Sequence, residues 1–296
     1  MAHTSVLLHE SVESLDLKEG EIFLDGTLGA GGHSALVAQT FGDEIEIIGL
    51  DRDGEAIKRS EERLRTLTTN AYLRNESFRN LDQVLFSLGI SGVDAILFDL
   101  GISSDQLDAL GRGFSFQRDE PLDMSMSGNN KEFNAKVILN TFDEDALELI
   151  LRGFGEEKFS RKIAREIVSK REIKPFETTF ELVEAVRAAT PTAYHRGKLH
   201  PATRTFQALR IATNEELTAL EEGLEKGFEH LNIGGRFAVI SFHSLEDRIV
   251  KHFFKKVVDE NRAKMITRKP IIPTDSEIKE NPRSRSAKLR VIEKNI

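Results

Sequence analysis

The chain has 296 residues, 39% of them hydrophobic, which is enough for one large domain or two modest ones. It contains no cysteine, which excludes disulfides, thiolate nucleophiles and cysteine-ligated zinc or iron–sulfur sites. The first residues carry no basic stretch followed by an apolar run, and no segment approaches the roughly 18 apolar residues of a membrane span. The eight histidines show no metal-ligand spacing. We therefore expect a cytoplasmic protein that uses neither a membrane nor a metal.

The net charge of −8 is unevenly distributed along the chain. Residues 1–110 hold 20 Asp and Glu against 8 Lys and Arg, whereas residues 152–211 hold 13 Lys and Arg against 7 Asp and Glu. Binding of a polyanion depends on local charge rather than on the total. The acidic total therefore does not exclude a nucleic-acid partner for the second half, although a solvated helical face would have the same composition.

The first hundred residues alternate between strand and helix patterns. Apolar runs at 22–24, 45–50, 71–74 and 93–98 predict strands, and residues 34–41 and 53–67 predict helices between them. Strands separated by helices form right-handed crossovers in a parallel sheet. This part of the chain is therefore predicted to be α/β.

Between about 107 and 211 the chain shows helix and loop patterns without a convincing strand. Helices are predicted over 156–171, over 178–189 with a capping box of Thr178 and Glu181, and from Pro201 onward. A turn at 232–234 precedes a strand at 235–241, and further strands are predicted at 264–268 and 288–292. We infer one α/β domain formed by 1–106 and 212–296, with 107–211 as a helical insertion.

A glycine-rich turn at 26–33 joins the first strand to the first helix. Such a turn lets a ligand approach the backbone closely. It matches neither G-x-G-x-x-G, because Ser34 stands where the third glycine would be, nor the phosphate-binding P-loop. Asp51 ends the second strand, 20 residues after Gly31, where a carboxylate can accept hydrogen bonds from ribose hydroxyls. NAD enzymes and S-adenosylmethionine (SAM) enzymes share this arrangement.

Acidic residues end three of the predicted strands, at Asp25, Asp51 and Asp99. The carboxyl ends of parallel strands meet at one edge of the sheet, where ligands of such folds bind. Three carboxylates favour a cationic, hydroxyl-bearing ligand over a pyrophosphate, so a sulfonium cofactor fits better than a dinucleotide. Phe78 follows the third strand, where its ring could stack on adenine or simply pack in the core.

A Ser/His/Asp triad is conceivable within residues 241–248 (SFHSLEDR), around His243. Three neighbouring residues rarely converge on one reacting atom, and the chain has no G-x-S-x-G elbow. We therefore discount a hydrolase.

Taken together, these segments resemble one family closely. It is the MraW/RsmH-type family of SAM-dependent enzymes that methylate N4 of a cytidine in small-subunit (16S) ribosomal RNA. The matching segments span nearly the whole chain: 5–10 (SVLLHE), 31–34 (GGHS), 51–53 (DRD), 99–108 (DLGISSDQLD), 112–117 (RGFSFQ), 121–124 (PLDM), 155–167 (GEEKFSRKIAREI), 200–211 (HPATRTFQALRI), 241–251 (SFHSLEDRIVK) and 281–286 (NPRSRS).

The resemblance implies a class I methyltransferase fold, with a seven-stranded sheet whose last strand is antiparallel and an inserted helical domain for substrate recognition. It implies methylation in the decoding region of the 16S RNA, with the small ribosomal subunit as partner. It also implies cofactor contacts at Gly31, Gly32, His33, Asp51, Phe78, Asp99 and Gln106. The chain departs from the family where Ser125 and Ser127 replace an Arg and an Asp, and the stretch around 270–282 is short.

The nucleophile of such a reaction needs a hydrogen-bond acceptor, because the N4 lone pair is delocalised into the cytosine ring. Asp99 is our candidate; backbone carbonyls and Ser103 are the alternatives. For RNA we expect contacts from basic and aromatic residues of the insertion. These are Arg112, Phe114, Phe116, His200 and Arg204, with a stripe of Lys158, Arg161, Lys162 and Arg165. Packing of the aromatic rings and solvation of the stripe are the simpler interpretations.

Three other functions stay open from the sequence. The first is an NAD-dependent oxidoreductase, which would lack the third glycine of its motif. The second is a non-catalytic RNA-binding or ribosome-assembly protein. Gly31, Asp51 and Asp99 argue against it, because a protein without catalysis would not need these cofactor-site residues. The third is methylation of a different base or of DNA.

Overall fold

The structure is a computed structural model that describes residues 5–102, 107, 111–127 and 133–295. Gln106 and Ser103, two residues considered for the site, lie outside these ranges. The chain divides into two compact units, one of residues 1–103 with 217–296 and the other of residues 104–216. Each unit is described by itself.

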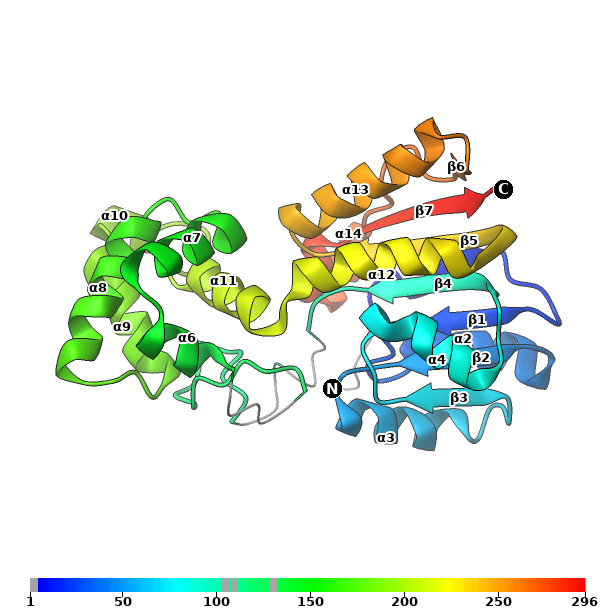
Figure 1. Cartoon of the computed structure of the whole chain (residues 1–296), viewed down its shortest axis with the longest axis horizontal. Helices are drawn as coiled ribbons and strands as arrows, with labels where there is room; N and C mark the ends of the chain where they lie inside the picture. Colours follow the sequence, from blue (N-terminus) through cyan, green and yellow to red (C-terminus); the bar gives the residue numbers. More distant parts are fainter. Residues whose placement is uncertain (1–4, 103–106, 108–110, 128–132, 296) are drawn as a thin grey trace. The chain divides into compact units, whose positions relative to one another are not determined.

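The first unit is built on a seven-stranded sheet (Figure 1). Its strand order is β3-β2-β1-β4-β5-β7-β6, and β7 runs antiparallel to both of its neighbours. The expected seven strands with an antiparallel last strand are therefore confirmed. The strands are β1 (Ile22–Asp25), β2 (Glu46–Leu50), β3 (Ala71–Arg74), β4 (Val93–Asp99), β5 (Leu231–Ser241), β6 (Ala263–Met265) and β7 (Lys288–Lys294).

The predicted turn at 232–234 is wrong, because these residues form an irregularity inside β5. Val93 pairs with Leu231, but Ala95 pairs with Arg236, so several residues of β5 lie opposite one of β4. The Asp94 carboxylate holds this region, accepting hydrogen bonds from Asn232 Nδ2 at 2.7 Å and from Ile22 N at 2.9 Å. A bulge of this kind uses the same residue types as a turn.

Two layers of helices bury the faces of the sheet. Leu24, Phe98 and Phe237 point to one face, and Phe23, Leu97 and Ile240 point to the other. The first face is covered by α4 (Leu81–Leu88), α12 (Glu216–His230) and α13 (Ser244–Asp259), and the second by α1 (Leu8–Leu15), α2 (Gly32–Phe41) and α3 (Gly54–Leu64). The short α14 (Asp275–Glu280) precedes β7.

The second unit is helical, and among its described residues the only β pairing is an isolated bridge between Pro121 and Thr178. The predicted capping box of Thr178 and Glu181 is confirmed. The last helix starts after Ala202, so Pro201 precedes it rather than lying in its first turn. The helices are α6 (Ala135–Thr141), α7 (Glu144–Gly155), α8 (Ser160–Ile173), α9 (Thr179–Ala189), α10 (Thr192–His195) and α11 (Thr203–Asn214).

Within the described residues of both units, no helix combines the length and the apolar character needed to cross a membrane.

Candidate active site

Asp25 braces the end of β1 against the start of α2. Its buried carboxylate accepts hydrogen bonds from Thr27 N at 3.2 Å and from the Ser34 hydroxyl at 2.7 Å. Burial, and to a smaller extent the charge of Asp51, raises the pKa of Asp25 to about 6. Asp25 is fully buried, whereas Asp51 is only partly buried, so Asp25 is a structural acid that adds negative potential to this edge of the sheet.

Asp51 shapes the glycine-rich turn directly. Its two oxygens accept hydrogen bonds from Gly29 N and from Asp53 N, each at 2.8 Å. Burial raises the pKa of Asp51 although these two hydrogen bonds lower it. A carboxylate oxygen has two lone pairs, so each oxygen can still accept a second hydrogen bond from a ligand hydroxyl.

The glycines at 31 and 32 allow close approach of neighbouring segments. Gly31 has φ +68°, a left-handed conformation, and a Cβ there would lie 2.9 Å from Ser60 Oγ. A Cβ on Gly32 would lie 1.9 Å from Ser5 Oγ, so no larger residue fits without a shift. His33 is buried, and its Nε2 lies 3.2 Å from the carbonyl oxygen of Val6. The turn is thus held between α3 and the segment that precedes α1.

Phe78, predicted to lie beside adenine, packs partly into the core. Its ring centroid is 4.5 Å from that of Phe98, and a Cβ on Gly223 would lie 2.5 Å from the Phe78 ring. The side chain is half-buried, so part of the ring is covered by the protein itself. Stacking on a base by the remaining surface stays a prediction.

Asp99 ends β4, and one oxygen of its carboxyl group, Oδ1, is buried without a hydrogen-bond partner among the residues that the structure describes. The backbone N of Asp99 donates to Thr27 Oγ1 at 2.5 Å. Burial, followed by the charges of Asp25 and Glu246, raises the pKa of Asp99 well above its usual range. An unpaired acceptor in an acidic environment is suited to a ligand that brings positive charge or a donor.

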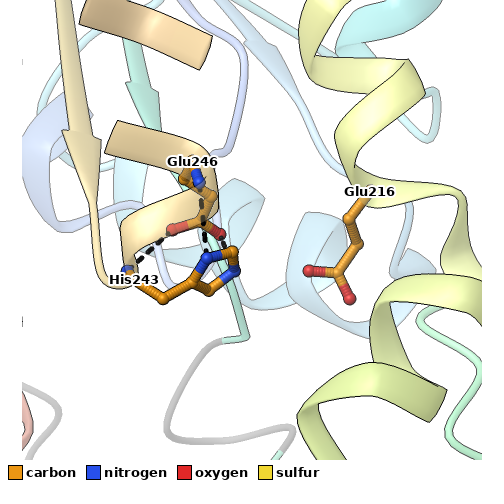
Figure 2. A group of neighbouring side chains, drawn as sticks. All are labelled: Glu216, His243 and Glu246. Carbon is orange, nitrogen blue, oxygen red and sulfur yellow. Dashed lines mark hydrogen bonds and ion pairs between the residues drawn. The ribbon is translucent and has the colours of Figure 1, made fainter. Parts of the chain in front are cut away.

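Glu246, which the sequence analysis did not single out, completes the acidic edge. It accepts hydrogen bonds from Phe242 N at 2.8 Å and from His243 N at 3.3 Å. In return, His243 Nδ1 accepts from Glu246 N (Figure 2). This is a capping box at the start of α13, and a polar residue followed three positions later by Glu is its sequence signal. Asp247 instead binds Lys288 and Arg290 on β7, so the discounted triad is not formed.

In the second unit, two of the residues predicted to contact RNA are engaged internally. Arg112 donates to the carbonyl oxygens of Ser125 and Met126, at 2.9 and 2.8 Å. Arg204 donates to the carbonyl of Glu156, and Phe114 is buried. The guanidinium groups thereby support the backbone of the unit. Their contact with RNA stays a prediction.

Phe116 and His200 form a stacked pair, with ring centroids 4.5 Å apart and an interplanar angle of 10°. Phe206 packs edge-on against Phe116 at 5.4 Å. Burial lowers the pKa of His200, as do the charges of Arg187 and His195. Of the predicted RNA-contact residues, Phe116 and His200 therefore lie together, with an imidazole that is mainly neutral at pH 7.

The predicted basic stripe, which apart from Lys158 lies on α8, is partly neutralised by α7. Arg165 Nε lies 3.4 Å from Glu144, and Arg161 lies 4.0 Å from Glu148. Lys158 lies over the rings of Phe159 and Tyr194. Lys162 is exposed, and no acidic partner is found for it among the described residues.

Ser125 and Ser127, where the resemblance leads us to expect an Arg and an Asp, contact each other with 3.1 Å between their hydroxyl oxygens. Asn214 holds the same segment, accepting from Met126 N and donating to the Met124 carbonyl at 2.8 Å each. Neighbouring Arg210 makes a two-pronged ion pair with Glu216 inside this unit. No local pattern indicates the role of Asn214, because its partners lie about 90 residues away.

An open sheet in which only β7 is antiparallel, with a glycine turn after β1 and carboxylates at the ends of β1, β2 and β4, is the arrangement of the class I methyltransferase fold. The particular family follows from comparison with known sequences: the chain belongs to the MraW methylase family, which it matches over residues 1–295. It is accordingly a SAM-dependent methyltransferase, and the alternative of an NAD-dependent oxidoreductase is excluded. The carboxylate edge, the orphaned Asp99 oxygen and the glycine cradle fit a sulfonium nucleoside.

Relatives are similar along their whole length. Proteins named "Ribosomal RNA small subunit methyltransferase H" from Clostridium botulinum, Sulfurihydrogenibium and Synechococcus elongatus are 46%, 50% and 48% identical. The alignments cover 98–99% of this chain and 94–98% of those proteins. Both units of this chain therefore have counterparts in these relatives.

Proposed function

We propose that this protein transfers the methyl group of SAM to N4 of a cytidine in the decoding region of 16S ribosomal RNA, in the cytoplasm. The observation that carries the proposal is the similarity to the ribosomal RNA small subunit methyltransferases over both units. The choice of N4 and of the decoding region rests on the resemblance of the motifs, among them residues 99–108 and 200–211.

The residues of the first unit are suited to hold the cofactor. Asp51 has lone pairs for the ribose hydroxyls, the turn at 29–33 brings the backbone close, and the acidic edge complements a positive charge. Gln106 belongs to the same proposed set by resemblance. When bound, SAM supplies a methyl group already activated by the positive sulfur.

The task left to the protein is to place the amine in line with that methyl group and to receive a proton from it. Asp99 Oδ1 is the proposed acceptor, since it is buried and unpaired among the described residues. Its raised pKa makes it a stronger base than an ordinary carboxylate once it is ionised. A substitution that tests this role is Asp99→Asn, for which we expect turnover to fall by about 100-fold or more. Near wild-type turnover would remove Asp99 from both cofactor binding and proton acceptance.

The second unit is proposed to recognise the RNA. Phe116 and His200 supply stacked aromatic surface, and Lys162 supplies positive charge. Arg112, Phe114 and Arg204 belong to the proposed set, with internal contacts that limit how much of each remains for RNA.

The decisive experiment supplies labelled SAM and unmodified small ribosomal subunits, then digests the RNA and identifies the nucleosides by mass. N4-methylcytidine at one position is the expected product. A different methylated nucleoside would preserve the enzyme class and change the substrate. Cofactor binding without any methylated nucleoside would favour the non-catalytic alternative.

A further inference from the structure

His243 is held in one orientation by its position at the start of α13. Its Nδ1 accepts a hydrogen bond from Glu246 N at 3.3 Å (Figure 2). The Glu246 carboxylate accepts in return from the backbone N of residues 242 and 243. Only 12% of the His243 side chain and 3% of that of Glu246 are exposed. The imidazole therefore has a fixed place at the carboxyl end of β5.

This arrangement determines where the ring carries its proton. A ring nitrogen that accepts a backbone N–H has no proton of its own, so neutral His243 carries its proton on Nε2. Nε2 lies 3.0 Å from Glu246 Oε1, a contact that is an ion pair only with a protonated ring, and the buried Nε2 makes no hydrogen bond among the described residues. A buried donor without a partner costs free energy unless a ligand uses it.

Asp99 Oδ1 is a buried hydrogen-bond acceptor that likewise has no partner among the described residues. Asp99 pairs with Ile240 across the parallel strands β4 and β5, and His243 follows Ile240 by three residues. The charge of Glu246 contributes to the raised pKa of Asp99, which also indicates that the two strand ends are close. An unpaired donor and an unpaired acceptor thus follow two adjacent strands at the same edge of the sheet.

We propose that His243 determines base specificity: its Nε2–H donates to N3 of the target cytosine while Asp99 Oδ1 accepts from the neighbouring N4 amino group. The proposal rests on the proposed function and deepens it. Cytosine presents an acceptor at N3 beside a donor at N4, whereas uracil presents a donor at N3 beside an acceptor at O4. The pair would therefore hold cytosine and reject uracil, because both hydrogen bonds would be lost with uracil. Both protein atoms are buried among the described residues.

The alternative is that His243 only caps α13, and two substitutions separate the roles. His243→Asn keeps an oxygen that can accept from Glu246 N, since Asn is among the best N-cap residues, but removes the distal N–H. His243→Gln extends an amide N–H to about the position of Nε2 but does not cap well. The Asn variant therefore keeps the helix cap without the hydrogen-bond donor, and the Gln variant keeps the donor without a good cap.

The experiment measures melting temperature, SAM affinity and methyl transfer to small subunits for the wild type and both variants. We expect His243→Asn to melt close to the wild type and to lose about 10- to 100-fold in kcat/KM for the subunits. His243→Gln should melt at a lower temperature and keep kcat/KM within about fivefold of the wild type. SAM affinity should be unchanged in both.

Full activity of His243→Asn would overturn the proposal. A loss of activity in proportion to the loss of melting temperature in both variants would overturn it as well. In either case His243 would serve only as the N-cap of α13. Weakened SAM binding by His243→Asn would also overturn it, because the donor would then serve the cofactor. Failure of the proposed function would be visible separately, as wild-type protein that binds SAM and leaves the subunits without N4-methylcytidine; the assignment of His243 would fall with it.

Discussion

Asp51 Oδ2 accepts a hydrogen bond from Gly29 N at 2.8 Å, so the carboxylate that is expected to bind the cofactor ribose also fixes the turn beside it. Ser60 holds the other side of the same residue, donating its hydroxyl to the Gly29 carbonyl at 2.9 Å. One acid thus both organises the backbone of the turn and keeps lone pairs for a ligand. A turn that is ordered before binding loses little entropy when the ligand arrives.

This double role predicts a large effect of Asp51→Ala on cofactor binding. We expect the dissociation constant for SAM to rise by about 10- to 100-fold, because hydrogen bonds to the ligand and the support of the turn are lost together. Isothermal titration calorimetry measures this dissociation constant. Asp43→Ala is the matched control, since Asp43 also braces a loop by accepting from Thr69 N at 2.6 Å. Both variants should melt at lower temperature, and equal SAM affinities in the two would refute the role of Asp51.

The raised pKa of Asp25 predicts how stability depends on pH. The pKa of Asp25 is about 6 in the folded protein, whereas the ordinary value, which applies to the unfolded chain, is 3.8. Between these pH values the folded state holds a proton that the unfolded state has released. Stability attributable to this group is therefore present below about pH 4 and is lost as the pH rises through 6, by about 3 kcal/mol in total.

Asp25→Asn resembles the protonated form and can keep both contacts, because the Ser34 hydroxyl can also accept. We expect the variant to gain stability relative to the wild type as the pH rises from 4 to 7. Urea unfolding at several pH values measures the difference. A difference that is constant with pH, or that grows toward acid, would contradict the raised pKa.

The sheet could be predicted from the sequence because its strands are short apolar runs that alternate with helices. The carboxylates Asp25, Asp51 and Asp99 could be placed at one edge for a general reason: parallel strands end on the same side. The turn predicted at 232–234 was wrong since turn residues also occur in bulges, and only the pairing with β4 distinguishes the two.

The remaining site residues depended on contacts that span long stretches of sequence. Nothing local indicates that Arg112 donates to the carbonyls at 125 and 126, or that Phe78 packs against Gly223. The Ser/His/Asp triad around His243, discounted from the sequence, is not formed, because Asp247 is adjacent in sequence but binds Lys288 and Arg290 in space. Side-chain partners follow from tertiary packing, which periodicity does not encode.

Phe78 is expected to contribute to both packing and cofactor binding. Phe78→Leu keeps much of the apolar volume and removes the aromatic face, so we expect it to lower the free energy of unfolding by about 1 kcal/mol. Loss of a stack on adenine should weaken SAM binding by about 2- to 10-fold. Phe228→Leu, in the core of the same sheet face, is the control that should lower stability alone. If SAM affinity is the same in both variants, Phe78 is a packing residue.

The last prediction concerns which lysine of α8 contacts RNA. Lys162 is exposed and has no acidic partner among the described residues, whereas Lys170 on the same helix lies 3.7 Å from Glu166. A lysine that neutralises an RNA phosphate releases a counterion, so its removal changes how affinity depends on salt. Lys162→Gln should weaken binding to small-subunit RNA and reduce the slope of log affinity against log salt by about 0.7 to 1.

Lys170→Gln makes the same change of charge on the same helix and should leave the slope as it is, because Glu166 already balances that lysine. Filter binding of labelled small-subunit RNA between low and moderate salt measures both slopes. Equal slopes for Lys162→Gln and the wild type would mean that α8 presents a solvated face. The RNA would then have to be held by other residues of the second unit, with the stacked Phe116 and His200 as the next position to substitute.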